Sequence, residues 1–217
     1  MIPLDPDRTL ALAYVPSARR PAVEALWRLD AALASVLATG REPLISQIRL
    51  AWWRESLEKL DRERPPAEPA LAALATHVLP AGVSGAELAS MEAGWAVLLS
   101  SEPLSAADLD LYASARGGLL FRYTARLLGD PGASVEAGGG AWALIDLARH
   151  SASADDAESA VQAARKVHMS RWPARLRPLG MLAALAIRDA EASRQRWEAK
   201  GAPRRMLRML RHRLTGK

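Results

Sequence analysis

Apolar residues recur at helical spacing along almost the whole chain, and this periodicity limits the fold more than any other feature. In the stretch before Gly40, apolar residues repeat every three or four positions: Val23, Leu26, Trp27, Leu29, Leu33 and Leu37. Alanine and leucine favour helix, whereas strong strand formers such as phenylalanine, present once, are scarce. No alternation of strand and helix patterns and no internal repeat is visible. The sequence therefore predicts an all-α bundle of about nine helices that forms one domain over residues 1–217.

Prolines, glycines and capping residues divide this pattern into segments. Ser84 with Glu87 and Ser105 with Asp108 have the spacing of capping boxes, and each pair predicts a helix start. The expected helices cover about residues 7–14, 21–40, 43–62, 68–79, 84–98, 105–128, 141–150, 153–172, 178–198 and 203–214. The glycine triplet at 138–140 is too short for a linker, and we expect it to let two helices approach closely.

Charge is distributed unevenly along the chain, although the net charge is only +5. Residues 165–217 hold 15 lysines and arginines against 3 acidic residues, a balance of +12, and residues 1–164 hold 14 against 21, a balance of −7. The basic part ends in an amphipathic helix at about 203–214, whose apolar residues are flanked by Arg204, Arg205, Arg208, Arg211 and Arg213. Such a helix can lie on an anionic membrane or in the groove of a partner protein. It can equally pack on the bundle, with its arginines reaching out to solvent.

Several classes of protein are excluded because their usual sequence features are missing. There is no cysteine, so the chain can form neither a disulfide framework nor a thiolate metal site. No two of the four histidines have metal-ligand spacing, and no phosphate-binding glycine loop or nucleophile elbow is present. No nucleic-acid module accompanies the basic helix, so we expect no nucleic-acid partner. A signal peptide and a run of about 20 apolar residues are both missing, which predicts a cytoplasmic protein, at most peripheral to the inner membrane.

Three short patches, in a fixed order within residues 5–150, carry a resemblance to a known family. Residues 20–27 read Arg-Pro-Ala-Val-Glu-Ala-Leu-Trp, and residues 48–55 read Ile-Arg-Leu-Ala-Trp-Trp-Arg-Glu. Residues 112–118 read Tyr-Ala-Ser-Ala-Arg-Gly-Gly, a tyrosine followed mostly by small residues. Together they resemble the squalene/phytoene synthase family. The resemblance implies a helical domain of the isoprenoid synthase type. It also implies prenyl transfer, in which two prenyl diphosphates condense head to head on Mg²⁺ held by two aspartate-rich motifs on facing helices.

The aspartates that the resemblance implies are missing from this chain. The first motif falls on Ala34, Ser35 and Ala38, none of which carries a carboxylate, and Asp30 lies about one helical turn too early. The second motif leaves only Asp146, without an acidic partner four residues on. Mg²⁺ prefers carboxylate oxygens, and a departing diphosphate needs the metal to neutralise its charge. We therefore expect no catalytic residue, no metal site and no cofactor.

Two functions are compatible with these features. The first is a catalytically degenerate member of the family that acts as an interaction or assembly factor at a membrane surface, because one branch of the family resembles a respiratory complex I assembly factor. Its partners would be a protein or an anionic membrane, with a prenyl or lipid molecule as a further ligand. The alternative is an active prenyl transferase, or its partner subunit, in isoprenoid biosynthesis, with Mg²⁺ held by other residues. A third reading, a basic helical module for nucleic acid, has no motif to support it.

A vestigial cavity is the first candidate site. Its expected walls come from the three patches and the two remaining aspartates: Arg20, Asp30, Arg49, Trp52, Trp53, Arg54, Tyr112 and Asp146. Neighbouring residues on a helix point about 100° apart, so only one of Trp52 and Trp53 can face the core. Core packing alone would explain these tryptophans, and surface ion pairs would explain Arg49 and Arg54. The second candidate site is the membrane or partner contact made by the arginines of the C-terminal helix.

Overall fold

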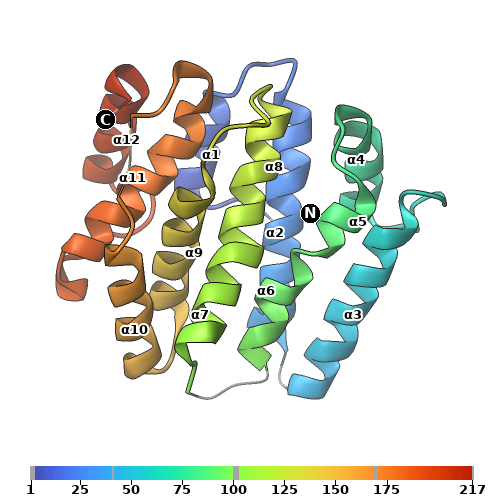
Figure 1. Ribbon diagram of the computed structural model, residues 1–217, viewed down its shortest axis with the longest axis horizontal. Coiled ribbons are helices and arrows are strands. Elements are labelled where there is room, and N and C mark those ends of the chain that lie inside the picture. Colours follow the sequence, from blue (N-terminus) through green and yellow to red (C-terminus); the bar gives the residue numbers. More distant parts are fainter. Residues whose placement is uncertain (1–2, 41, 100–102, 169–170, 217) are drawn as a thin grey trace.

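The computed structural model describes residues 3–40, 42–99, 103–168 and 171–216, and every regular element in these ranges is a helix. The α-helices are α1 (Pro6–Ala13), α2 (Arg20–Thr39), α3 (Pro43–Lys59), α4 (Pro69–His77), α5 (Gly85–Ala89), α6 (Glu92–Ala96), α7 (Ala106–Tyr112), α8 (Leu119–Leu127), α9 (Glu136–His150), α10 (Ala154–Arg165), α11 (Arg177–Glu191) and α12 (Pro203–Thr215). Figure 1 shows most of them running up and down the molecule, with α9 near the middle. The predicted all-α fold is confirmed. The described residues form twelve α-helical segments, where about nine helices are expected.

The additional segments arise where one expected helix is divided and where another changes its helical type. The helix expected at 84–98 is divided into α5 and α6 near Ser90, whose hydroxyl donates to the Glu87 carbonyl oxygen at 2.6 Å. The helix expected at 105–128 runs on without a break, but residues Ala113–Gly118 between α7 and α8 are π-helical. A π-helical turn of this kind is uncommon and changes which side chains share a face.

Helix starts follow the capping residues of the sequence. The side chain of Ser84 accepts from the Glu87 N–H, and that of Ser105 accepts from the Asp108 N–H. The acidic side chains bond back to the capping residues, so both predicted capping boxes are confirmed. Asp5 caps α1 in the same way, because its carboxylate accepts from the backbone N–H of the first turn.

The glycine triplet lies inside α9, which begins at Glu136, so the expected start at residue 141 is wrong. A Cβ atom added to Gly139 would lie 2.1 Å from the carbonyl oxygen of Gly117 in the π-helical segment. Only glycine lets two backbones come so close. The close helix approach expected from the triplet is present, and this contact outweighs the weak helix propensity of glycine.

The structure ends α11 at Glu191, earlier than the expected residue 198. The Trp197 indole Nε1 donates to the carbonyl oxygen of Asp189 at 2.7 Å. This bond satisfies a carbonyl group of the last helical turn, which no longer has a partner within the helix. The chain therefore turns back on itself before α12 begins, through a largely irregular segment at 192–202 whose one regular part is a short 3₁₀ turn at Arg194–Arg196.

Aromatic rings pack at the centre of the bundle. The Phe121 ring stacks on Trp142 with centroids 6.0 Å apart and meets Trp172 edge-on at 6.4 Å. The buried Trp27 of α2 donates its Nε1 to the Thr124 hydroxyl at 3.0 Å. These contacts join α2, α8 and α9 into one core, and the functional groups described below lie beside it.

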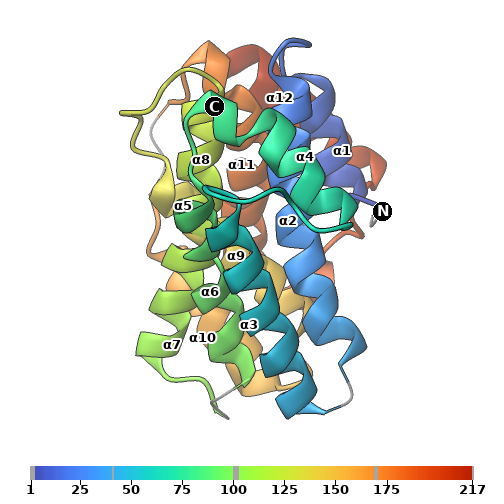
Figure 2. The same cartoon turned by 90° about the vertical axis from the view of Figure 1, so that its right-hand side faces the viewer.

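The two ends of the longest axis carry different helices. In Figure 1, α12 lies at the left end and α3 at the right end, and Figure 2 looks onto the end that carries α3 and α4. The C-terminal helix expected at about 203–214 is confirmed as α12. Among the helices of the described ranges, none has the length and apolar character needed to cross a membrane.

Candidate functional site

A cavity of about 620 Å³ opens between α2, α9 and the π-helical segment. Ala34, Ser35 and Ala38 of α2 line it, and these are the positions that the resemblance assigns to the first aspartate motif. Asp146 of α9, the acid that remains of the second motif, also lines the cavity. Apolar and aromatic side chains complete much of the wall: Ala31, Leu37, Trp95, Leu98 and Leu147. The cavity thus lies between the two helices on which the resemblance places the metal ligands.

Six charged side chains form a closed ring beside this cavity, with acids and bases alternating. This ion-pair ring consists of Asp5, Arg8, Asp30, Arg116, Asp146 and Lys200. Successive members approach within 2.7–3.7 Å, and the longest step is the one from Lys200 back to Asp5. The ring connects α1, α2, the π-helical segment, α9 and the irregular segment at 192–202. Its three positive and three negative charges cancel.

Arg116 lies inside the protein with no exposed surface, and so does Asp30. The Arg116 Nε donates to Asp30 Oδ1 at 3.0 Å, and its Nη2 donates to Asp30 Oδ2 at 3.2 Å and to Asp146 Oδ2 at 2.8 Å. Its Nη1 donates to the Tyr112 hydroxyl. The guanidinium carbon also lies 4.1 Å from the centre of the Trp95 ring, a cation–π contact. One guanidinium thus bridges carboxylates of two facing helices.

Burial and charge act in opposite directions on the groups of the ring. Burial would raise the pKa of Asp146, but the positive charges of Arg116 and Lys200 outweigh it and hold that pKa well below its usual range. Burial would lower the pKa of Arg116, but the carboxylate of Asp30 raises it further above its usual value. Burial also raises the pKa of the Tyr112 hydroxyl. At neutral pH, Asp146 and Arg116 are therefore charged and Tyr112 is neutral.

The ring brings together three of the residues expected at the vestigial cavity. Asp30, Tyr112 and Asp146 all contact Arg116. The three cations of the ring and Asp5 are missed by the sequence reasoning. The sequence does contain an indication that Arg116 belongs to the site. It follows Tyr112 by one helical turn, in a segment whose other residues are mostly small. A charge in such a segment needs a buried partner.

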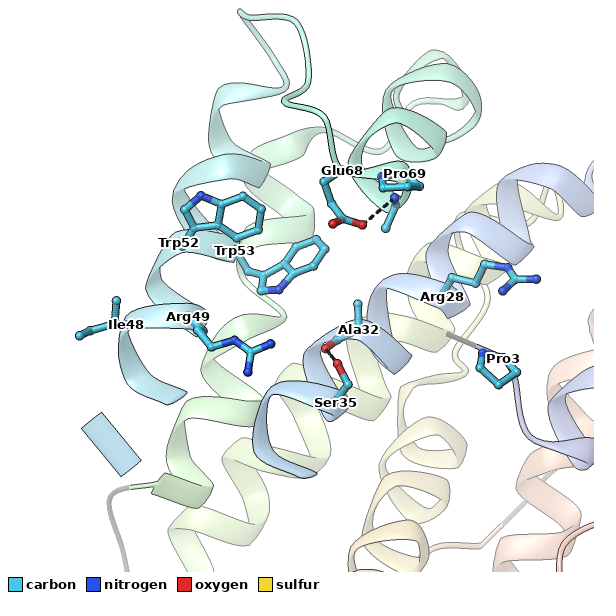
Figure 3. Close-up of a pocket in the computed structure, with 11 residues that line it drawn as sticks. Pro3, Arg28, Ala32, Ser35, Ile48, Arg49, Trp52, Trp53, Glu68 and Pro69 are labelled. Carbon is cyan, nitrogen blue, oxygen red and sulfur yellow. Dashed lines mark hydrogen bonds between the residues drawn. The ribbon is translucent and has the colours of Figure 1, made fainter. Parts of the chain in front are cut away.

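Three other expected residues, Arg49, Trp52 and Trp53, line a different hollow. It is a groove of about 840 Å³ between α2, α3 and α4. Figure 3 shows both tryptophan rings and the Arg49 side chain on α3, across the groove from Ala32 and Ser35 of α2. Trp53 is 8% exposed and Trp52 is 44% exposed, so one ring faces the core and the other does not, as expected.

The outer face of α3 is apolar in its N-terminal half. Leu44, Ile45, Ile48 and Trp52 are all exposed, and two of them, Ile48 and Trp52, also line the groove. Their spacing places them on one side of the helix. Contiguous exposed apolar side chains usually mark a site of contact with another molecule. We refer to these four residues as the α3 face.

The remaining two expected residues line neither hollow. Arg20 donates to the carbonyl oxygens of Ala13 and Val15, at 3.1 Å each, and so holds the turn before α2. The exposed Arg54 lies 4.0 Å from the carboxylate of Glu92. A single cavity lined by all eight expected residues is therefore wrong. The helical periodicity does not reveal that α2 separates the ring from the groove.

Comparison with known proteins identifies the family. A family model described as squalene/phytoene synthase matches residues 4–151, which is more than half of the chain. The chain belongs to the squalene/phytoene synthase family. No curated protein and no solved structure matches it. The matched region ends just after α9, so α10, α11 and α12 lie outside it, as does Lys200 of the ion-pair ring.

The residues at the cavity of this family member do not fit the Mg²⁺ ions that the family uses. Asp30 and Asp146 are engaged by Arg116, and Ala34 and Ala38 offer no carboxylate. In the part of the chain that the structure describes, no group of three or more His, Cys, Asp or Glu side chains could hold a metal ion. Mg²⁺ is bound through carboxylate and water oxygens in a near-octahedral arrangement. A ring whose charges already cancel has little attraction for it.

The second candidate site, on α12, is only partly as expected. Arg205 is 3% exposed, and it donates to Asp189 Oδ2 at 2.6 Å and to Asp7 Oδ2 at 2.8 Å. The prediction that Arg205 belongs to a surface contact is therefore wrong, because two buried aspartates hold its guanidinium inside. Of the other four arginines, two are exposed and two are half-buried: Arg204 and Arg211, and Arg208 and Arg213, respectively.

Proposed function

We propose that this protein is a catalytically degenerate member of the squalene/phytoene synthase family that acts as an interaction or assembly factor at a membrane surface. The observation that carries the proposal is the Arg116 guanidinium between Asp30 and Asp146. Prenyl transfer requires a diphosphate to depart, and its charge must be neutralised as it does so. The ion-pair ring has no net positive charge to offer a diphosphate and no free carboxylate to offer Mg²⁺. Both halves of the required charge compensation are therefore missing.

The cavity itself supports the binding of a ligand without chemistry. Its volume of about 620 Å³ and its largely apolar wall suit an apolar chain, such as a prenyl or lipid chain. The polar part of the wall is the neutral ion-pair ring. A ligand head group of low charge therefore fits it better than a diphosphate does.

The α3 face supports a role in protein interaction. It is exposed and apolar, and it continues into the groove of about 840 Å³. Arg49 at this groove donates to the Thr39 hydroxyl at 3.3 Å, and within the described ranges no carboxylate lies within 4.0 Å of it. An amphipathic helix of a partner could lay its apolar side on this face and place an acidic residue at Arg49. Assembly of a respiratory complex, which the family resemblance suggests, would use such a contact.

The absence of catalysis is tested with the purified protein and prenyl diphosphates. Farnesyl or geranylgeranyl diphosphate with Mg²⁺ should give no head-to-head product under conditions in which an active family enzyme does. Titration with Mn²⁺ should leave the electron paramagnetic resonance signal of the free ion undiminished. Product formation that a chelator abolishes would instead establish the alternative function, an active prenyl transferase.

The assembly role is tested in a strain that lacks the protein. The amount of assembled respiratory complex I should fall in this strain and return with the wild-type chain. An Ile48→Glu variant, which puts a charge on the α3 face, should fail to restore it. A Leu111→Glu variant is the matched control, because Leu111 is a similarly exposed apolar residue on α7. Normal assembly in the strain without the protein would contradict the role.

A further inference from the structure

Helix α12 buries an arginine and a histidine beside one methionine and turns two of its leucines outward. The residues that it buries are Arg205, Met209 and His212, which are 3, 0 and 1% exposed. Leu207 and Leu214 are 68 and 78% exposed, more than any other large apolar side chain in the described ranges. A helix that served only to complete the fold would bury its leucines and expose its arginines.

Buried ion pairs hold α12 in this orientation. Arg205 donates to Asp7 of α1 and to Asp189 of α11, and both aspartates are themselves buried. Rotating the helix to bury Leu207 or Leu214 would separate these charges. Asp189 would keep its pair with Arg149, but the buried Asp7 would lose the guanidinium that neutralises it. The outward position of the leucines is therefore a consequence of the fold.

Arginines share the exposed side with the leucines. Arg204 and Arg211 lie three and four residues from Leu207, so they occupy the same side of the helix. No carboxylate of the described residues lies within 4.0 Å of either guanidinium, whereas Arg208 pairs with Glu198 at 2.8 Å. The helix is also the end of a segment, 165–217, whose charge balance is +12. The outward side of α12 is thus apolar and positive at once.

We infer that this side of α12, formed by Arg204, Leu207, Arg208, Arg211 and Leu214, binds an anionic lipid bilayer. Leucines of an interfacial helix enter the boundary between head groups and acyl chains, and arginines remain at the phosphates. A bilayer with anionic lipids presents an extended negative plane, which complements the positive segment as a whole. The inference deepens the proposed function, because it gives the membrane location a specific surface.

The position of α12 in the molecule agrees with this assignment. Figure 1 places α12 and α3 at opposite ends of the longest axis. A flat bilayer that contacts α12 therefore leaves the α3 face free to bind a protein. The protein can therefore bind a bilayer through α12 and a partner protein through the α3 face at the same time. A factor that acts on proteins at a membrane needs both contacts.

Cosedimentation with vesicles tests the inference on the full chain. The wild type should bind vesicles of phosphatidylglycerol and phosphatidylcholine, and bind vesicles of phosphatidylcholine alone at least tenfold more weakly. A Leu207→Ser/Leu214→Ser variant and an Arg204→Gln/Arg211→Gln variant should each bind the anionic vesicles about tenfold or more less tightly. High salt should weaken the binding of the wild type, because the arginine contribution is screened.

A Leu44→Ser/Ile48→Ser variant is the matched control, because it removes two similarly exposed apolar side chains from the α3 face. It should bind the anionic vesicles as the wild type does. All substituted side chains are exposed, and thermal unfolding shows whether each variant is folded. Absent binding by the wild type would overturn the inference, and so would full binding by the leucine variant or loss of binding by the control. None of these results depends on Mg²⁺ or prenyl transfer, so the inference and the proposed loss of catalysis fail separately.

Discussion

Replacement of Arg116 by methionine tests the ion-pair ring most directly. Methionine retains an unbranched, flexible side chain but has no charge and no N–H donor. The substitution removes two hydrogen bonds to Asp30, one to Asp146 and one to Tyr112. The two aspartates keep Arg8 and Lys200 as partners in the ring, but they no longer share a cation, and α2 and α9 lose their direct electrostatic connection.

The expected loss follows from burial. Removing one partner of a buried ion pair costs about 3–5 kcal/mol, because the opposite charge remains inside. Arg116 serves two carboxylates, so we expect the free energy of unfolding to fall by about 4–5 kcal/mol. The control is Arg122→Met, because Arg122 pairs with Glu136 at 2.8 Å but its side chain is 48% exposed. Such a surface pair contributes about 0–1 kcal/mol. Urea unfolding, followed by tryptophan fluorescence, measures both variants.

The dependence of stability on pH gives a second readout of the same variant. Asp146 has a lowered pKa in the folded protein, so its contribution to stability is complete above its unfolded pKa, near 4, and is lost as the pH falls below it. Without Arg116, the folded pKa of Asp146 rises toward the unfolded value. The Arg116→Met variant should therefore lose less of its stability between about pH 5 and pH 2 than the wild type does.

Two results would refute this reasoning. A loss below about 1 kcal/mol in Arg116→Met, similar to that of Arg122→Met, would mean that the ring does not hold the two helices together. An unchanged pH dependence would mean that Arg116 is not the main positive charge acting on Asp146. Either result would also remove the main support for a cavity that works without a metal.

Two further pairs of substitutions test the packing of α3 and of α9. Trp53→Ala should lower the free energy of unfolding by about 3–5 kcal/mol, because the Trp53 indole is buried, whereas Trp52→Ala should lower it by about 1 kcal/mol. Equal losses in urea unfolding would contradict the placement of these two indoles. Gly139→Ala should lower the free energy of unfolding by about 3 kcal/mol, because its Cβ would lie 2.1 Å from a carbonyl oxygen. A Cβ at Gly140 would lie 3.4 Å from the nearest atom, the Cβ of Ala113, so Gly140→Ala should leave the stability unchanged or raise it by up to about 1 kcal/mol. Similar melting temperatures for the two glycine variants would show that the backbones do not approach so closely.

The helical fold could be predicted because its signals are local. Periodicity and capping boxes depend on residues three or four positions apart, and the structure has helices where they indicate them. The errors occur where a distant contact decides the outcome. Gly139 continues α9 because Gly117 of another segment packs against it, and α11 ends at Glu191 beside a bond from Trp197. No local pattern contains these contacts.

Two of the three acids of the ion-pair ring were predictable, whereas Asp5 and the three bases were not. Asp30 and Asp146 stand out because they are the carboxylates left near the two missing motifs. Their partner Arg116 is 86 residues from Asp30 and 30 residues from Asp146, so its role depends on the tertiary fold. The orientation of α12 is a similar case. Its amphipathic pattern is local, but the side that faces inward is determined by Asp7, which is 198 residues from Arg205.

The ion-pair ring also determines what restoring the missing aspartates would do. A carboxylate at Ala34 or Ala38 would face the cavity, but Asp30 and Asp146 would still be held by Arg116. A metal that took these two carboxylates would leave the Arg116 guanidinium buried and without its partners. Mg²⁺ binding should therefore remain weak in an Ala34→Asp/Ala38→Asp variant and should improve only when Arg116 is replaced as well. The loss of the motif and the presence of the arginine are thus coupled through the charge balance of one cavity. Mn²⁺ affinities of the double and triple variants, compared by electron paramagnetic resonance, measure that coupling, and equal affinities would show that the arginine does not oppose the metal.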